Sequence, residues 1–68
     1  MKISLEKARV NSKLAQADVA HEMGVSIKTI QNWEDGIYFP RIDQLYQLME
    51  IYNVSVGDIF IPTKKRKV

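Results

Sequence analysis

Apolar residues recur along the chain at intervals of three and four positions, the spacing that places side chains on one face of an α-helix. Val19, Ala20 and Met23 show this spacing, with polar residues between the last two. Strand-like alternation is absent from the sequence, apart from a weak extended tendency at residues 60–61. The pattern therefore predicts an all-α protein with helices at about residues 5–11, 16–23, 27–35, 42–52 and 55–60.

Residues with marked capping preferences stand at the ends of these segments. Ser4 and Ser26 precede the first and third helices, where a side-chain oxygen can accept a hydrogen bond from a free backbone N–H group. Gly24 and Gly36 follow the second and third helices, where a left-handed residue commonly ends a helix. Asn53 is placed in the same way after the fourth helix. The capping residues therefore support the boundaries that the periodicity predicts.

Length and composition indicate one small domain without a metal centre or disulfide bonds. The chain has 68 residues and no cysteine, and its one histidine, His21, cannot form a zinc site alone. No apolar run approaches the length of about 20 residues that a membrane-spanning helix needs. The first residues do not resemble a signal peptide. We therefore expect a cytoplasmic protein that uses no cofactor and has no membrane association.

The net charge of +2 depends on the C-terminal residues. Ten Lys and Arg side chains oppose eight Asp and Glu side chains, and four of the ten lie at positions 64–67. Residues 1–63 therefore carry six positive and eight negative charges, a net charge of −2. Overall charge alone gives no support for nucleic-acid binding, so this function has to be judged from where the charges lie.

The segments 16–23 and 27–35 are separated by a tight turn, an arrangement in which the second helix can project into the major groove of DNA. Ile30 and Trp33 can anchor one side of this second helix. The other side carries four candidate base-reading residues: Ile27, Lys28, Gln31 and Asn32. A cation, two carboxamides and a small apolar group are the side chains that contact base edges. A solvated helix can carry the same polar residues, and Ile27 can also cover the edge of the core.

This motif resembles that of the phage-repressor and Cro-like helix-turn-helix family, also called the Xre family, over residues 14–36, which read LAQADVAHEMGVSIKTIQNWEDG. The likeness continues at Pro40 and in the segment LYQLMEIYNVSVGDIF at 45–60. The positions in register are Gln16, Ala20, Gly24, Val25, Ser26, Ile30, Trp33, Glu34, Gly36, Pro40, Val54 and Ser55. The resemblance implies a compact five-helix, lambda-repressor-like domain over residues 1–61, with the helix-turn-helix motif at about 16–35.

The resemblance also implies contacts with the DNA backbone. Gln16 would bind a phosphate at the positive end of the second helix, Ser26 would contact the backbone, and Arg41 would face phosphates or the minor groove. Three of the four outer residues of the third helix would then meet bases. The fourth, Gln31, is assigned less firmly and can serve the backbone instead.

In the family, an arginine of the first helix pairs with the glutamate of the third. The corresponding residues are Arg9 and Glu34, which implies a structural ion pair. Two positions depart from the family pattern. Ala15 stands where Ser or Thr usually caps the second helix, and Arg41 or Ile42 stands where a cap for the fourth helix is expected. We therefore expect the starts of these two helices to be held less firmly.

Two further regions are candidates for contacts. Residues 62–68 are expected to form a flexible tail, and four of its cations would attract phosphates: Lys64, Lys65, Arg66 and Lys67. Its alternatives are an inert solubilising end and a nuclear localisation signal, which suits a protein of bacterial or phage type poorly. Surplus apolar residues favour a homodimer interface formed by Tyr46, Ile51, Phe60 and Ile61.

The sequence contains no recognisable group of catalytic residues. Its serines are explained as caps or turn residues, and its one histidine would have to serve as the general base for any of them. We therefore expect not an enzyme but a sequence-specific transcriptional regulator encoded by a bacterium or phage. It would bind a palindromic operator as a dimeric repressor, and it would act by occluding or contacting RNA polymerase. Two alternatives stay open: the antitoxin of a toxin–antitoxin pair, which would also bind a small toxin, and an adaptor that binds protein instead of DNA.

Overall fold

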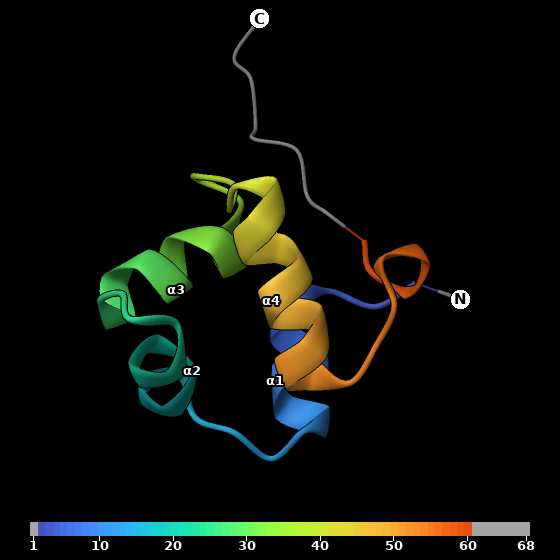
Figure 1. The fold of residues 1–68 in the computed structure, drawn as a ribbon, viewed down its shortest axis with the longest axis horizontal. Helices are drawn as coiled ribbons and strands as arrows, with labels where there is room; N and C mark the ends of the chain where they lie inside the picture. The colour runs from blue at the N-terminus through green and yellow to red at the C-terminus, as the bar shows by residue number, and fades with distance from the viewer. Residues whose placement is uncertain (1, 61–68) are drawn as a thin grey trace, which may run out of the picture.

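The computed structural model describes residues 2–60, which form a bundle of four α-helices (Figure 1). The elements are α1 (Leu5–Asn11), α2 (Gln16–Met23), α3 (Ile27–Asp35), α4 (Ile42–Tyr52) and the 3₁₀ helix η1 (Val56–Asp58). No β-strand occurs within this part of the chain, so the all-α prediction is confirmed. The four α-helices lie where the apolar periodicity predicts them.

The fifth helix, predicted at residues 55–60, is not an α-helix. The single 3₁₀ turn η1 replaces it, and Ile59 after the turn is extended and forms a parallel bridge with Ile3. The Ile3 N–H donates to the Asp58 carbonyl at 2.9 Å, and the Phe60 N–H donates to the Ile3 carbonyl at 2.7 Å. Backbone pairing with the N-terminal segment therefore takes the place of helical hydrogen bonds, and the five-helix count becomes four α-helices and one 3₁₀ turn.

Side chains and left-handed residues close the helix ends as the sequence predicts. Ser4 Oγ accepts the Lys7 N–H at 3.0 Å, and Ser26 Oγ accepts the Thr29 N–H at 3.1 Å. Three residues end helices with φ values of 72°, 77° and 56°, in the order Gly24, Gly36 and Asn53. These local interactions fix the boundaries of α2 and α3 and hence the length of the turn between them.

The two helices without a capping side chain begin with half of a capping box. Asp18 Oδ2 accepts the N–H of Ala15 at 2.8 Å, and Gln44 Oε1 accepts the N–H of Arg41 at 2.8 Å. The reciprocal bond is missing in both cases, because the cap residues have no side-chain acceptor. Each start is therefore held by one hydrogen bond from the third helical residue instead of two.

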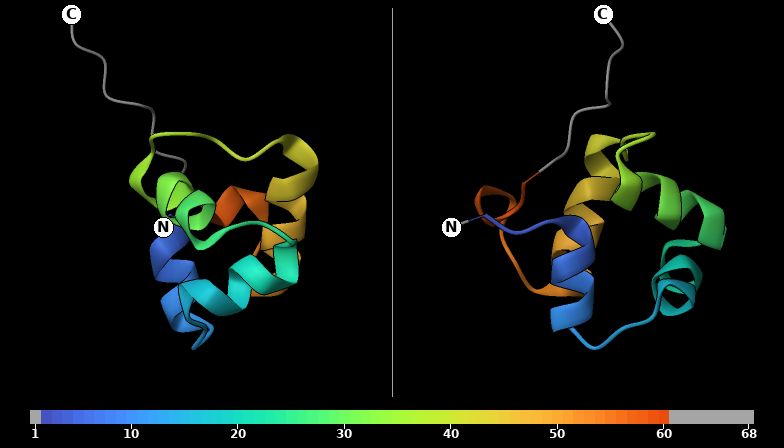
Figure 2. Two further views of the ribbon diagram at one scale, coloured as in Figure 1. Left: turned by 90° about the vertical axis from the view of Figure 1, so that its left-hand side faces the viewer. Right: turned by 180° about the vertical axis from the view of Figure 1, so that it is seen from behind.

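The core lies between the helices, with α2 packed against α3 and α4, and α1 packed against the same two helices. Its ten buried residues are all apolar or aromatic: Leu5, Ala8, Val19, Ala20, Ile30, Trp33, Leu48, Met49, Tyr52 and Ile59. The views in Figures 1 and 2 agree that α3 lies at one edge of the bundle, on the side away from η1 and the N-terminal segment. This arrangement leaves the outer side of α3 uncovered by other elements.

Candidate nucleic-acid interface

The turn between α2 and α3 is determined by Gly24. Its φ of +72° is a left-handed conformation that L side chains rarely adopt. The Val25 N–H donates to the Ala20 carbonyl at 3.0 Å and closes the end of α2. The Val25 side chain packs against the core, and Ser26 follows as the N-cap of α3. The chain therefore reverses within three residues and sets α3 across α2, the geometry of a helix-turn-helix motif.

The core holds one side of α3, and the other side is open. Ile30 and Trp33 are buried, with exposed fractions of 1% and 5%. Ile27 is 45% exposed, Lys28 is exposed, and Asn32 is half-buried. Lys28 and Asn32 lie one turn apart, so their side chains are neighbours on the helix surface. The structure thus presents three of the four candidate base-reading residues on the open side of α3.

Gln31, the fourth candidate, is engaged with α2. Its Nε2 donates to Gln16 Oε1 at 3.3 Å, and Gln16 Nε2 in turn donates to Glu34 Oε1 at 2.9 Å. Both glutamines are half-buried. The side-chain amide of Gln16, the expected phosphate ligand, is therefore hydrogen-bonded to that of Gln31. This bond favours a role for Gln31 in positioning Gln16.

Arg9 and Glu34 form an ion pair between α1 and α3. Arg9 Nε lies 2.7 Å from Glu34 Oε2, and the two side chains are only 12% and 4% exposed. Arg9 Nη1 also donates to the Leu14 carbonyl at 2.9 Å. The hydrogen bond to Glu34, opposed by burial, raises the pKa of Arg9 above its ordinary value. The pair is therefore a fixed and largely desolvated part of the core edge, and the guanidinium is engaged within the chain.

Sequence reasoning missed the link from Gln16 to Glu34 and from Gln31 to Gln16. The bonded residues are separated by 18 and 15 positions, so no local pattern connects them. The only signal for these links was the implied Arg9–Glu34 pair. A carboxylate fixed at the edge of the core can accept hydrogen bonds from more than one donor, so a second partner of Glu34 could have been expected.

The two other candidate backbone ligands in the described region lie on the surface. The Ser26 hydroxyl, beyond capping α3, lies 3.0 Å from Thr29 Oγ1. Arg41 is exposed and its Nε lies 3.3 Å from Asp43 Oδ1, in a pair whose side chains are 74% and 70% exposed. Such an exposed pair contributes little stability, so Arg41 can exchange this partner for a phosphate at little cost.

The four candidate dimer residues do not have equal exposure. Tyr46 on α4 is 58% exposed and Phe60 is 54% exposed. Ile51 is half-buried and packs against the core, so much of its surface is already used within the chain. Ile61 lies outside the described residues, as do four of the candidate phosphate ligands: Lys64, Lys65, Arg66 and Lys67.

The turn, the anchored α3 and its open polar side define a helix-turn-helix protein, and the comparisons agree. A family model described as helix-turn-helix matches residues 5–59, so the chain belongs to this family, and the resemblance found in the sequence is confirmed. The chain is also similar to an uncharacterised helix-turn-helix-type transcriptional regulator of Methanocaldococcus jannaschii. The two are 36% identical over 61 residues, which cover 90% of this chain and 92% of that protein. No solved structure matches the chain significantly.

Residues 2–60 offer neither a membrane-spanning helix nor a metal site. None of the helices there is both long and apolar enough to span a membrane. No group of three or more His, Asp or Glu side chains in this region is placed to hold a metal ion.

Proposed function

We propose that the protein regulates transcription by binding double-stranded DNA with α3 in the major groove. The observation that carries this proposal is the division of α3 into two sides. Ile30 and Trp33 fix one side in the core, while Lys28 and Asn32 lie one turn apart on the other. The chain belongs to the helix-turn-helix family, and its relative from Methanocaldococcus jannaschii is named as a transcriptional regulator. Both findings support a function in transcription.

The side chains on the open surface match the groups that base edges offer. Lys28 can donate to guanine O6 or N7, and Asn32 can pair with adenine N6 and N7. Ile27, 45% exposed at the first turn of α3, can contact a thymine methyl group. We therefore assign direct base reading to these three residues.

Backbone contacts would orient α3 without reading sequence. Gln16 at the first turn of α2, Ser26 at the start of α3 and Arg41 at the start of α4 are the candidates among residues 2–60. Gln31 supports Gln16 through their hydrogen bond of 3.3 Å and is assigned a positioning role. The cations at 64–67 would add attraction to phosphates of any sequence.

We further propose that the protein acts as a homodimeric repressor on a palindromic operator and blocks access of RNA polymerase. The helix-turn-helix motif formed by α2 and α3 provides one reading helix, and a two-fold dimer would double the number of base pairs read. The exposed aromatic side chain of Phe60 is available for an interface outside the motif. A dimer would select two half-sites in inverted orientation.

Selection of bound sequences from a random DNA pool tests this function. We expect one enriched motif, arranged as an inverted repeat, with affinity that falls as salt is raised. An enriched motif without a repeat would contradict the dimer but keep the DNA-binding assignment. No enrichment, together with no salt-dependent binding of any DNA, would exclude the proposed function and favour an adaptor that binds protein.

A further inference from the structure

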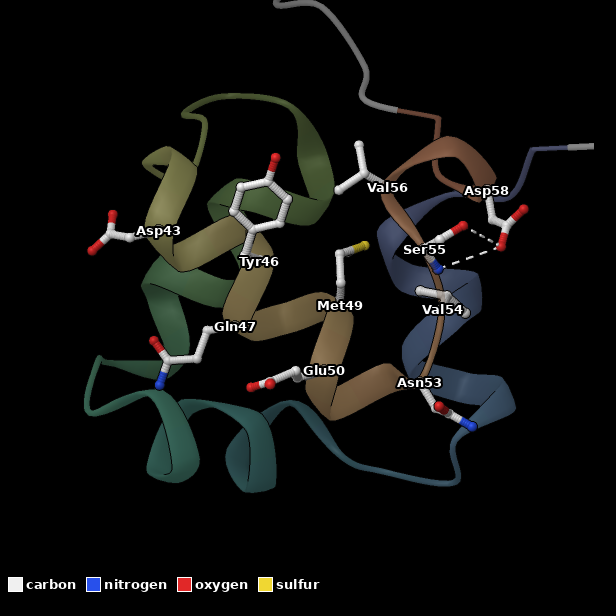
Figure 3. Close-up of a pocket in the computed structure, with 10 residues that line it drawn as sticks. All are labelled: Asp43, Tyr46, Gln47, Met49, Glu50, Asn53, Val54, Ser55, Val56 and Asp58. Atoms are coloured by element: carbon white, nitrogen blue, oxygen red, sulfur yellow. Dashed lines mark hydrogen bonds between the residues drawn. The ribbon is translucent and has the colours of Figure 1, made fainter.

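An open groove runs along the outer side of α4 and η1 (Figure 3). It is lined by the outer side of α4, the connection after it and η1: Asp43, Tyr46, Gln47, Met49, Glu50, Asn53, Val54, Ser55, Val56 and Asp58. None of the residues assigned to DNA contact above lines it. The groove is therefore a second surface whose role the proposed function does not explain.

The centre of the groove is apolar. Figure 3 shows the Met49 side chain between the ring of Tyr46 and the side chain of Val56. Tyr46 is 58% and Val56 is 39% exposed, whereas Met49 is buried. Exposed aromatic and aliphatic groups around a buried floor provide contact area for an apolar backbone or for the methylene groups of long side chains.

The rim of the groove is acidic. Asp43, Glu50 and Asp58 contribute three carboxylates, and none of the ten lining residues is a Lys, Arg or His. Asp43 is paired with Arg41, and Asp58 accepts the Ser55 hydroxyl at 2.9 Å, a bond that lowers the pKa of Asp58. The Glu50 carboxylate has no hydrogen bond or ion pair within the described region. The groove therefore suits an extended ligand that carries both apolar groups and positive charges.

We propose that this groove binds the basic segment 61–68 of the same chain. The segment reads IPTKKRKV and combines two apolar residues at its start with four consecutive cations. Ile61 and Pro62 would contact the apolar centre, and the cations would face the acidic rim. This is the charge and hydropathy pattern that complements the groove.

The chain geometry permits this contact within one molecule. Asp58 lines the groove, and Phe60 follows two residues later. Four to seven further residues reach Lys64 to Lys67, which corresponds to about 13–23 Å of extended chain. The groove follows α4 from Asp43 to the cap residue Asn53, a distance of about 15 Å along the helix. A tethered segment also has a high effective concentration at a neighbouring site, so modest contacts suffice for binding.

A second copy of the chain is a less suitable occupant. A two-fold contact through this groove brings identical surfaces together, so Glu50 of one copy would approach the acidic rim of the other. Like charges opposed in this way disfavour association. The cations of the segment can also pair with DNA phosphates, but one side chain cannot occupy both places. The groove would therefore compete with DNA for the segment.

Paramagnetic relaxation measured by NMR on the full chain tests the inference without DNA. The chain has no cysteine, so Thr63→Cys gives one site for a spin label beside the four cations. We expect the largest loss of amide signal at Tyr46, Glu50 and Val56, and little loss at Lys28 on α3. Higher salt should reduce the effect.

The Glu50→Lys variant should abolish the selective loss of signal, whereas Glu22→Lys, the same change at an exposed position on α2, should retain it. Unchanged amide shifts elsewhere would show that both variants are folded. Uniform or absent signal loss in the groove would overturn the inference. Loss of the same signals in chains that carry no spin label, after mixing with spin-labelled chains, would also overturn it, because the segment would then come from a second copy. Each outcome is independent of whether the protein binds DNA.

Discussion

Gln16 at the start of α2 donates a hydrogen bond of 2.9 Å to Glu34 on α3. The second oxygen of the same carboxylate lies 2.7 Å from Arg9 Nε on α1. One buried carboxylate therefore connects three helices at the edge of the core. If Gln16 binds a phosphate as proposed, its position is already fixed, so little conformational entropy would be lost on binding.

Arg9→Ala is expected to lower the free energy of unfolding by about 3–5 kcal/mol, because it leaves the Glu34 carboxylate buried without its cation. Urea unfolding measures the change. The matched control is Arg41→Ala, which removes a solvent-exposed pair and should leave the free energy of unfolding nearly unchanged. Equal stability of the Arg9 variant and the wild type would show that the pair contributes nothing to the fold.

Gln31→Ala is expected to weaken binding of all DNA sequences by about 0.5–1.5 kcal/mol, because Gln16 loses one of its two side-chain hydrogen-bond partners. Base preference should stay the same at every position of the site. Titrations of the selected operator and of single-base variants measure both quantities. Loss of preference at one position would identify Gln31 as a base reader and contradict the positioning role.

Lys28→Ala and Asn32→Ala are each expected to cost about 1–3 kcal/mol at the operator and to relax preference at one base pair. The measurement is a fluorescence titration at fixed salt. Lys7→Ala and Asn11→Ala, which change exposed residues of the same types on α1, serve as controls and should bind as the wild type does. Operator affinity unchanged in both α3 variants would refute the assignment.

Tyr52 is expected to make stability depend on alkaline pH. Burial, with a smaller effect of the negative charge of Glu34, raises the pKa of Tyr52 from 10.0 to about 12. The unfolded chain therefore releases this proton at lower pH than the folded chain does, and stability falls as pH rises from 10 to 12. Urea unfolding across this interval should show that Tyr52→Phe lacks this contribution, whereas Tyr46→Phe, at an exposed position, retains it. Parallel curves for wild type and Tyr52→Phe would contradict the shift.

Replacement of the cations at 64–67 by alanine changes the net charge of the full chain from +2 to −2. We expect weaker binding of operator and scrambled DNA alike, and a salt dependence reduced by about 0.9 for each phosphate that the segment no longer neutralises. Specificity should survive, because α3 is unchanged. A control with Lys7 and Lys13 replaced should keep the wild-type slope. Identical slopes and affinities for the variant and the wild type would mean that the segment does not bind phosphates.

The parts of the fold that follow from neighbouring residues could be predicted from the sequence. Ser4 and Ser26 each cap a helix through an N–H three residues later, and Gly24 ends α2 through its own φ. Apolar spacing likewise identified Ile30 and Trp33 as the buried side of α3. These interactions span at most one or two helical turns, so the local sequence contains the information that determines them.

Interactions between distant segments could not be predicted from the local pattern, and the Arg9–Glu34 pair was implied only by the family resemblance. The region 55–60 carries Val56 and Ile59 at a helical spacing, but Ile59 pairs with Ile3 at the other end of the described chain. Helical periodicity also places Gln31 on an outer side without revealing Gln16 as its partner. The acidic groove depends on how η1 folds back beside α4, and no single segment encodes that arrangement.

The pairing of Ile3 with Ile59 brings the two ends of the described chain together beside η1, at the end of the bundle opposite α3 (Figures 1 and 2). A reporter or a second domain fused through a linker at either end would thus emerge far from the helix-turn-helix surface. The ends of the described chain thus lie on one side of the bundle, and the open side of α3 lies on the other. Fusions at both ends at once should leave α3 unobstructed, provided that they preserve the two hydrogen bonds of this bridge.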